Sequence, residues 1–162
     1  TKIFNDADLA FTPLFEAKPH VFVGENHPLS SYEKVTPKDL EDYPRYSFEQ
    51  GSNNSFFYSE EPLGQLPHRQ EITYSDRGTL TNLLTNHNGF TISTGVLSDE
   101  MNEGIVAIPL EADETMTVGY LSHAHLEFSD LAQRYIKKLR EVISANPTVS
   151  TYFEPEPTPE TE

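Results

Sequence analysis

Residues 21–40 read Val-Phe-Val-Gly-Glu-Asn-His-Pro-Leu-Ser-Ser-Tyr-Glu-Lys-Val-Thr-Pro-Lys-Asp-Leu, and this stretch says most about the fold. The three apolar residues at its start, together with His20, predict a short β-strand. Gly24, Asn26 and Pro28 favour turns over continued pairing, so we expect the strand to end there. A polar loop then leads to a second structural signal at the far end of the stretch.

That second signal, Val35–Leu40, is a pattern that begins helices. Thr36 can cap the helix N-terminus, Pro37 suits the first helical position, and Asp39 can return a hydrogen bond to the cap backbone. The helix must be short, because a proline follows Tyr43 and a residue before proline is driven away from helical geometry. We therefore expect a short capped helix directly after the strand and its loop.

Two longer helices are predicted further along the chain, from apolar residues spaced three and four apart. The first is capped by Ser75 or Asp76 and stopped by Gly89 in the usual C-terminal position, and the second is capped by Ser129. The faces expected to be buried comprise Leu80, Leu83, Leu84 and His87 in the first helix, and Leu131, Tyr135, Leu139, Val142 and Ile143 in the second.

The remaining pattern consists of short strands. Segment 1–18, which Pro13 and Pro19 interrupt, is read as loop, with a short strand as the alternative. Because strands alternate with helices, the order favours an α/β fold with a mainly parallel sheet. The predicted strands are 45–49, 71–74, 90–96, 105–110 and 116–121.

Composition excludes several classes of function. The chain has 162 residues, enough for one domain or two small lobes, and its lack of cysteine excludes disulfides, thiolate catalysis and cysteine-based zinc sites. Its net charge of −15, from 26 acidic and 11 basic residues, repels phosphate backbones, so this fragment should not bind DNA by itself. No apolar run is long enough to span a bilayer and no signal peptide begins the chain, so we expect a cytoplasmic protein.

Three stretches together resemble the effector-binding domain of LysR-type transcription regulators. The first is 21–29 with 35–40, since that family has a strand, a His-Pro-Leu turn and a helix introduced by Val-Thr-x-x-Asp-Leu. The second is Phe-Glu-Gln-Gly at 48–51 with Asp-Arg-Gly-Thr-Leu-Thr-Asn-Leu-Leu at 76–84. The third is Asn-Gly-Phe-Thr-Ile-Ser-Thr-Gly at 88–95 with Ile-Pro-Leu at 108–110, and these last two are most similar to a Gram-positive branch that controls cysteine and methionine metabolism.

The resemblance implies an α/β fold similar to type II periplasmic binding proteins, with the second lobe complete and the first lobe only partly present. By this comparison residues 19–115 form the second lobe, and residues 116–145 return to the first lobe as a strand and a helix. Residues 1–18 are an N-terminal segment of uncertain structure, and 146–162 are a disordered acidic Pro/Glu/Thr tail. The helix-turn-helix head of the family is not in this chain, so DNA is a partner only through that absent domain.

The resemblance also implies ligand contacts at a loop that follows a strand and at a helix N-terminus. Free backbone N–H groups and the positive end of the helix dipole favour carboxylates there. A purely local interpretation competes: a surface turn for the loop, a cap for Asp76, a surface charge for Arg77, and strand-end hydrogen bonds for Ser93 and Thr94. The candidate ligand-binding residues are Glu49, Gln50, Gly51, Ser52, Asn53, Asp76, Arg77, Thr79, Ser93 and Thr94.

Signals for catalysis and metal binding are weak. The chain contains no Gly-x-Ser-x-Gly, phosphate loop or dinucleotide fingerprint. His123 and His125 would share one face of a strand, but no third ligand is near them in sequence, and a solvent-facing pair is the simpler interpretation. We therefore expect no enzymatic activity, no cofactor and no metal.

The function expected from these observations is that of a sensor domain which binds a small effector, amino-acid-like or a carboxylate, for which O-acetylserine is a hypothesis. We also expect a homo-oligomer, because the last helix has a broad apolar face with little to cover it. Two other functions stay open from the sequence: a solute-binding protein of a transporter with the same fold, and a small enzyme similar to prephenate dehydratase.

Overall fold

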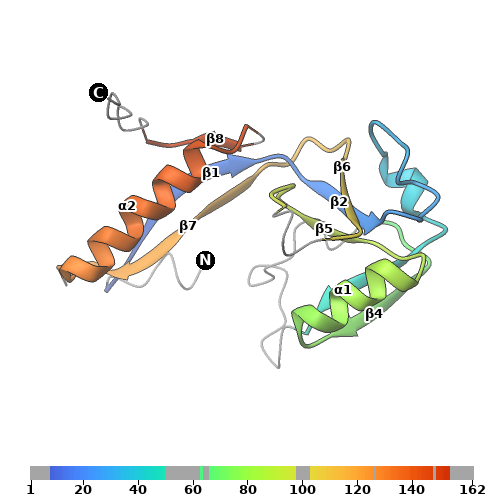
Figure 1. The fold of residues 1–162 in the computed structure, drawn as a ribbon, viewed down its shortest axis with the longest axis horizontal. Helices are drawn as coiled ribbons and strands as arrows, with labels where there is room; N and C mark the ends of the chain where they lie inside the picture. Colours follow the sequence, from blue (N-terminus) through green and yellow to red (C-terminus); the bar gives the residue numbers. More distant parts are fainter. Residues whose placement is uncertain are drawn as a thin grey trace. The chain divides into compact units, whose positions relative to one another are not determined.

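The computed structural model describes residues 8–49, 63, 66–97, 103–125, 127–147 and 149–153 (Figure 1). The chain divides into two compact units, which are described separately. Unit 1 comprises Thr1–Ala17 and Thr117–Glu162, and unit 2 comprises Lys18–Met116.

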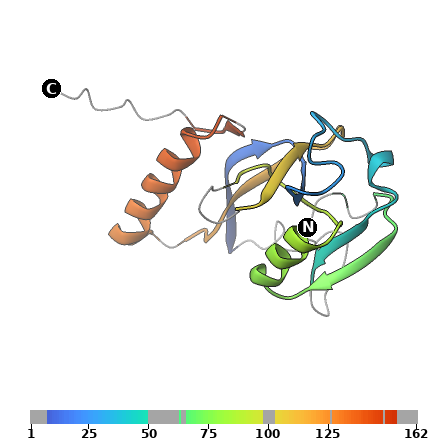
Figure 2. The same cartoon turned by 45° about the vertical axis from the view of Figure 1, so that its right-hand side comes forward.

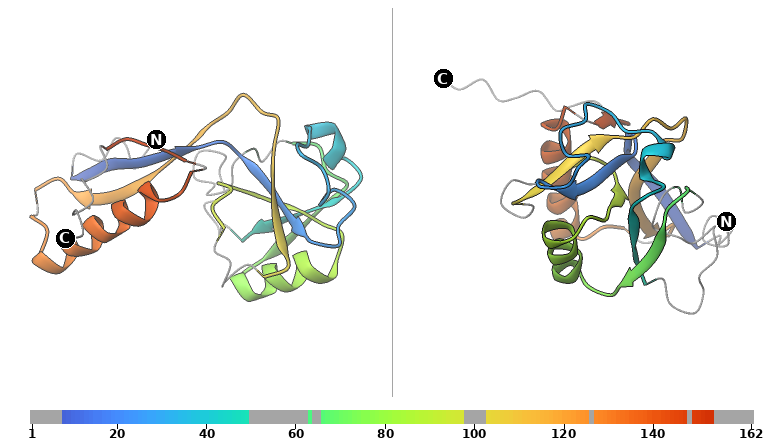
Figure 3. Two further views of the ribbon diagram at one scale, coloured as in Figure 1. Left: turned by 45° about the horizontal axis from the view of Figure 1, so that its top comes forward. Right: turned by 90° about the vertical axis from the view of Figure 1, so that its right-hand side faces the viewer.

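Unit 2 is built on two small sheets. The strand β2 is central in the first sheet and runs antiparallel to both of its neighbours, β5 and β6. The strands β3 and β4 form the second sheet and are parallel, side by side in the right-hand view of Figure 3. These strands are β2 (His20–Gly24), β3 (Pro44–Phe48), β4 (Gln70–Tyr74), β5 (Thr91–Ser93) and β6 (Ile105–Pro109).

The two sheets of unit 2 are joined at Phe90. An isolated parallel bridge connects Arg45 to Phe90, the residue just before β5. The Tyr46 N–H donates to the Phe90 carbonyl at 2.7 Å, and the Phe90 N–H donates to the Pro44 carbonyl at 3.0 Å. The start of β5 is therefore held against the start of β3, which joins the two sheets.

The prediction of a mainly parallel sheet is wrong for the strand that lies at the centre. The alternation of strands and helices stops after β5, because β5, β6 and β7 (Met116–His123) follow one another with no described helix between them. A parallel neighbour needs a crossover connection, usually a helix, so strands without one are free to pair in the antiparallel sense. The fold is an α/β fold with mixed sheets.

The loop and short helix after β2 form as predicted. The 3₁₀-helix η2 spans Pro37–Leu40, and the Asp39 carboxylate accepts from the Thr36 N–H at 2.8 Å and from its hydroxyl at 2.6 Å. His27 is buried against the Tyr43 ring, 4.5 Å away between centroids, and its Nδ1 accepts from the Leu29 N–H at 3.1 Å. The core of this region consists of Val21, Val23, Leu29, Val35, Leu40, Phe90, Ile92, Ile108 and Leu110.

The helix α1 (Arg77–Asn86) packs on β2 at very short range, and Figure 2 shows it in front of the strands of unit 2. A Cβ atom at Gly24 would lie 2.2 Å from the Leu84 carbonyl oxygen, so only glycine allows this approach. Gly89 does not stop the helix as predicted, because α1 ends at Asn86 and Gly89 has no positive φ. It is needed instead for space, since a Cβ there would lie 2.2 Å from the Tyr46 ring.

Unit 1 consists of a three-stranded sheet and one helix, in the strand order β7-β1-β8. The helix α2 spans Asp130–Ser144, and the predicted cap is confirmed because the Ser129 hydroxyl accepts from the Ala132 N–H at 3.3 Å. Figure 1 shows α2 lying along the sheet. The core consists of Leu14, Phe15, Ala17 and Ile143, with Val118, Tyr120, Leu139, Val149 and Phe153 packed against it.

Two strands of unit 1 lie where loop or disorder was expected. The strand β1 spans Leu9–Ala17 although Pro13 is inside it, and β8 spans Val149–Thr151 in the predicted tail. Proline cannot donate to a ladder, but β8 pairs only with 15–17, so Pro13 lies beyond its end. Residues 149–151 order because they complete the sheet beside β1, which local composition does not reveal.

The buried face of α2 also differs from the prediction. Leu139 and Ile143 pack toward the core, whereas Leu131, Tyr135 and Val142 are 78%, 67% and 60% exposed. The sheet covers one stripe of the helix, and the apolar residues on the neighbouring stripe have no cover among the described residues. Periodicity identified an apolar helix, but the width of the sheet decided which part of it is buried.

Candidate functional site

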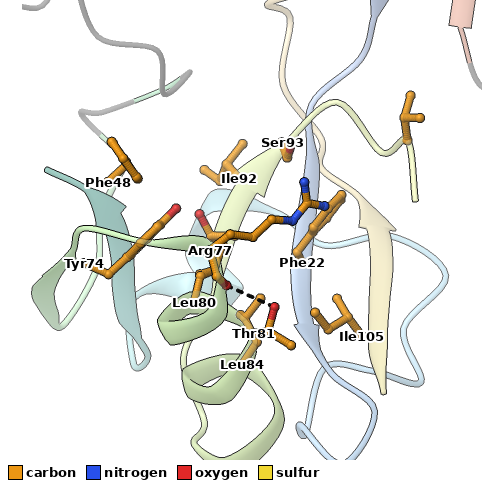
Figure 4. Close-up of a pocket in the computed structure, with 12 residues that line it drawn as sticks. Phe22, Phe48, Tyr74, Arg77, Leu80, Thr81, Leu84, Ile92, Ser93 and Ile105 are labelled. Atoms are coloured by element: carbon orange, nitrogen blue, oxygen red, sulfur yellow. Dashed lines mark hydrogen bonds between the residues drawn. The ribbon is translucent and has the colours of Figure 1, made fainter. Parts of the chain in front are cut away.

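Unit 2 contains a pocket of about 460 Å³, between the first turns of α1 and the ends of the strands (Figure 4). This volume lies in the range of sites for small molecules. Every described residue that lines it belongs to unit 2. The lining residues are Phe22, Phe48, Tyr74, Arg77, Leu80, Thr81, Leu84, Thr91, Ile92, Ser93, Val96 and Ile105.

One wall of the pocket is aromatic. Phe48 and Tyr74 are the last residues of β3 and β4, and the parallel register places them opposite one another. Their rings meet edge to face, 5.5 Å apart between centroids and 80° between planes. Strands paired in parallel with matched ends bring their final side chains to the same edge, and here that edge opens into the pocket.

The N-terminus of α1 forms the polar rim. Asp76 is its N-cap and accepts from the Thr79 N–H at 2.9 Å and from the Thr79 hydroxyl at 2.5 Å. The hydrogen bonds from the Thr79 side chain and then from its backbone hold the pKa of Asp76 below its usual value, so this carboxylate stays ionised as a cap. The next residue, Arg77, extends across the pocket in Figure 4, toward the strands that carry Phe22 and Ser93.

The rest of the lining is predominantly apolar. Leu80 and Leu84 come from α1, Phe22 from β2 and Ile92 from β5. Phe22 and Ile92 are 8% and 4% exposed, so they form a rigid base. The Thr81 hydroxyl donates back to the Arg77 carbonyl at 3.1 Å, as helical threonines often do, and this occupies its donor.

Arg77 is the one formally charged residue among the described residues that line the pocket. A guanidinium has five N–H donors in a planar fork that matches a carboxylate. The arrangement can therefore bind an anionic group beside Arg77 and an apolar body against the rings. Nothing in the described lining pairs a nucleophile with a base.

The model of the LysR substrate-binding domain matches residues 1–144 of the chain. The chain belongs to this family. Among solved structures, this LysR domain is similar to the effector-binding domain of QuiR in complex with shikimate, at 21% identity and a TM-score of 0.60 over 83% of this chain and 68% of that chain. It is also similar to the regulatory domain of MetR from N. meningitidis, at 14% identity and a TM-score of 0.63, over 90% of this chain and 72% of that one.

A third similar structure is HinK, a LysR family transcriptional regulator from Pseudomonas aeruginosa, at 17% identity and a TM-score of 0.57. The match covers 85% of this chain and 49% of HinK, so this LysR domain spans about half of that regulator. At these identities the likeness shows the fold. None of the curated protein sequences compared with the chain matches it.

The candidate residues of the LysR domain fall into three groups. Arg77 and Ser93 line the pocket. Asp76 and Thr79 pair with each other in the helix cap, and the Thr94 hydroxyl accepts from the Val96 N–H at 3.4 Å, a long local contact at the strand end. The Glu49 N–H donates to the Tyr74 carbonyl at 2.8 Å, so this backbone extends the β3 ladder. The other four, Gln50, Gly51, Ser52 and Asn53, lie outside the described residues.

The aromatic wall was missed by sequence reasoning. Phe48 and Tyr74 each end a predicted strand and precede a polar segment, and that position was the available signal. Pairing the two required knowing that β3 and β4 are neighbours in register, 26 residues apart. Phe22 and Ile105 were expected only as strand residues, and nothing local marks which face of a strand a ligand contacts.

No group of three or more histidine, cysteine or acidic residues that could hold a metal ion occurs in the described part of the chain. This includes the surroundings of His123 and His125. Within the same residues, no helix is both long and apolar enough to cross a membrane.

Proposed function

We propose that this chain is the effector-sensing part of a cytoplasmic LysR-type DNA-binding transcription regulator, and that it binds a small carboxylate metabolite in the pocket of unit 2. The observation that carries the proposal is the pocket itself, in which Arg77 is the only formal charge among the described lining residues. An anion that enters the pocket loses part of its bound water and gains a charge-assisted hydrogen bond from Arg77.

The comparisons support a small-molecule ligand. The similar domain of QuiR is described in complex with shikimate, which carries a carboxylate. The resemblance to regulators of cysteine and methionine metabolism makes an amino-acid-like effector such as O-acetylserine a specific hypothesis within the same proposal. We propose a binding function and no catalysis, because the described lining combines one cation with hydroxyls and apolar groups.

Regulation requires that the effector favour one arrangement of the regulator over another. A ligand shifts such an equilibrium only by its difference in affinity for the two arrangements. In this proposal residues 19–115 act as the ligand-binding second lobe, and 116–145 carry the chain back to the first. The domain works within a homo-oligomer, and DNA is contacted through a helix-turn-helix domain of the parent protein.

The test is a thermal-shift screen of the chain against carboxylate and amino-acid metabolites, followed by isothermal titration of each compound that raises the melting temperature. Binding stabilises the folded state, by an amount that grows with ligand concentration. Saturable binding that Arg77→Gln weakens supports the proposal. A screen in which no metabolite shifts the melting temperature, repeated on the full regulator, contradicts it.

A further inference from the structure

We infer that the pocket of unit 2 selects a carboxylate with an apolar ring as its body and without an ammonium group. The inference rests on the proposed function and names the class of effector within it. It assigns the carboxylate to Arg77 and the body of the ligand to Phe48, Tyr74 and Phe22.

The charge of the lining residues explains why the ligand should carry a carboxylate and no ammonium group. Arg77 attracts a carboxylate, but the described lining has no carboxylate of its own that could accept an ammonium group. The two acidic residues that adjoin lining residues in the sequence, Glu49 and Asp76, are not among the described lining residues, and Asp76 accepts hydrogen bonds from Thr79. An amino-acid ligand would therefore bring its ammonium group close to the Arg77 guanidinium, with no described lining carboxylate to offset the repulsion between the two cations, which is costly. A ligand whose only charge is negative avoids that cost.

The shape of the lining explains why the body of the ligand should be an apolar ring. Phe48 and Tyr74 present an edge-to-face pair along one wall, and the opposite side is formed by Phe22 and Ile105 (Figure 4). A ring placed between these walls contacts aromatic faces and edges, which favour stacked or T-shaped neighbours. An aliphatic chain of equal length would bury less area and would lose more conformational freedom.

The described lining offers few hydrogen-bonding groups, which argues against a ligand whose body carries many hydroxyls. Of the polar lining residues besides Arg77, Thr81 already donates to the Arg77 carbonyl, and Thr91 is 4% exposed. Ser93 lines the same pocket as Arg77, and its hydroxyl can donate to the carboxylate end of a ligand. Hydroxyls placed against the apolar walls would lose water without gaining partners.

The experiment is a matched series of probes titrated calorimetrically into the 162-residue chain at neutral pH. The reference probe is 3-phenylpropanoate. L-phenylalanine adds only the ammonium group, 3-phenylpropanamide removes only the charge, and propanoate removes only the ring. We expect 3-phenylpropanoate to bind at least about tenfold more tightly than each of the other three.

Two substitutions locate the binding. Arg77→Gln should raise the Kd of 3-phenylpropanoate about tenfold or more and should leave the weak binding of the amide unchanged. Arg69→Gln is the control, because Arg69 is also an exposed arginine of unit 2 but does not line the pocket. Phe48→Ser, at a residue 39% exposed, should weaken every probe that carries the ring and should leave propanoate unaffected.

The outcomes separate this inference from the proposed function. If L-phenylalanine or O-acetylserine binds more tightly than 3-phenylpropanoate, the class assigned here is wrong while the sensor function stands. If 3-phenylpropanoate binds equally to Arg77→Gln and to the unaltered chain, the role of Arg77 is wrong. The sensor function itself fails only if the metabolite screen is negative for the chain and for the full regulator.

Discussion

Replacing Gly24 with alanine should separate α1 from β2 and loosen the pocket. The new Cβ would lie 2.2 Å from the Leu84 carbonyl oxygen and 3.2 Å from its carbon. Both are backbone atoms, so no side-chain rotation relieves the clash. Carbon atoms need roughly 3.5 Å or more for a normal contact, so the helix must move away by about 1 Å.

The magnitude follows from two opposing terms. Overpacking of this kind costs about 1–3 kcal/mol, and the contact is at the severe end because the obstacle is backbone. Alanine also restricts the unfolded chain, which offsets about 0.4–1 kcal/mol. We therefore expect the free energy of unfolding to fall by about 2 kcal/mol. Since Leu84 lines the pocket, ligand affinity should fall as well.

The assay is urea unfolding followed by far-ultraviolet circular dichroism, because the chain has no tryptophan to report by fluorescence. The control is Gly78→Ala in the first turn of α1, where a Cβ meets only the Asp76 Oδ1 at 3.2 Å. That variant should be neutral or more stable, since alanine favours helix over glycine by about 1 kcal/mol. If both variants unfold at the same urea concentration as the unaltered chain, the close packing of α1 on β2 does not limit stability and the argument fails.

Two further results are expected. Burial lowers the pKa of His27 below its ordinary value of 6.5. Below about pH 6.5 the unfolded chain therefore binds more protons at this residue than the folded chain does. The contribution of His27 to the free energy of unfolding should be complete above about pH 6.5 and should decline as the pH falls toward the lower pKa of the folded state. His27→Gln should flatten that decline in urea unfolding series, whereas replacing the exposed His123 with Gln should not; equal slopes would show that His27 is not its source. Tyr135→Glu on the exposed stripe of α2 should reduce self-association in sedimentation experiments, and Gln133→Glu on another face of the helix should not; a chain that is already monomeric at high concentration would refute this.

Sequence reasoning succeeded where the determining contacts lie within a few residues. The caps at Thr36, Asp76 and Ser129 each involve a partner three residues away, so residue type and spacing were sufficient. Arg77 and Ser93 were also identified as candidates in advance, because they sit beside a helix start and a strand end, and both line the pocket. The contribution of the loop 50–53 stays a prediction, since it lies outside the described residues.

Sequence reasoning failed where the partners are distant in the chain. The antiparallel pairing of β2 with β6 joins residues more than 80 apart, and no local pattern encodes its direction. Gly89 illustrates the same limit, because a glycine after a helix suggests a stop, while the real constraint is the ring of Tyr46. The exposed face of α2 depends likewise on how far the sheet beneath it extends.

By itself the sequence determined the family, the helix starts, the short strands and the residue types at their ends. Only the tertiary structure decided which strand ends meet, and thereby that Phe48, Tyr74 and Arg77 share one pocket. The physical reason is one of range. Capping and turn formation are settled by backbone hydrogen bonds over three or four residues, whereas a binding site forms when long-range pairing brings distant side chains to the same edge.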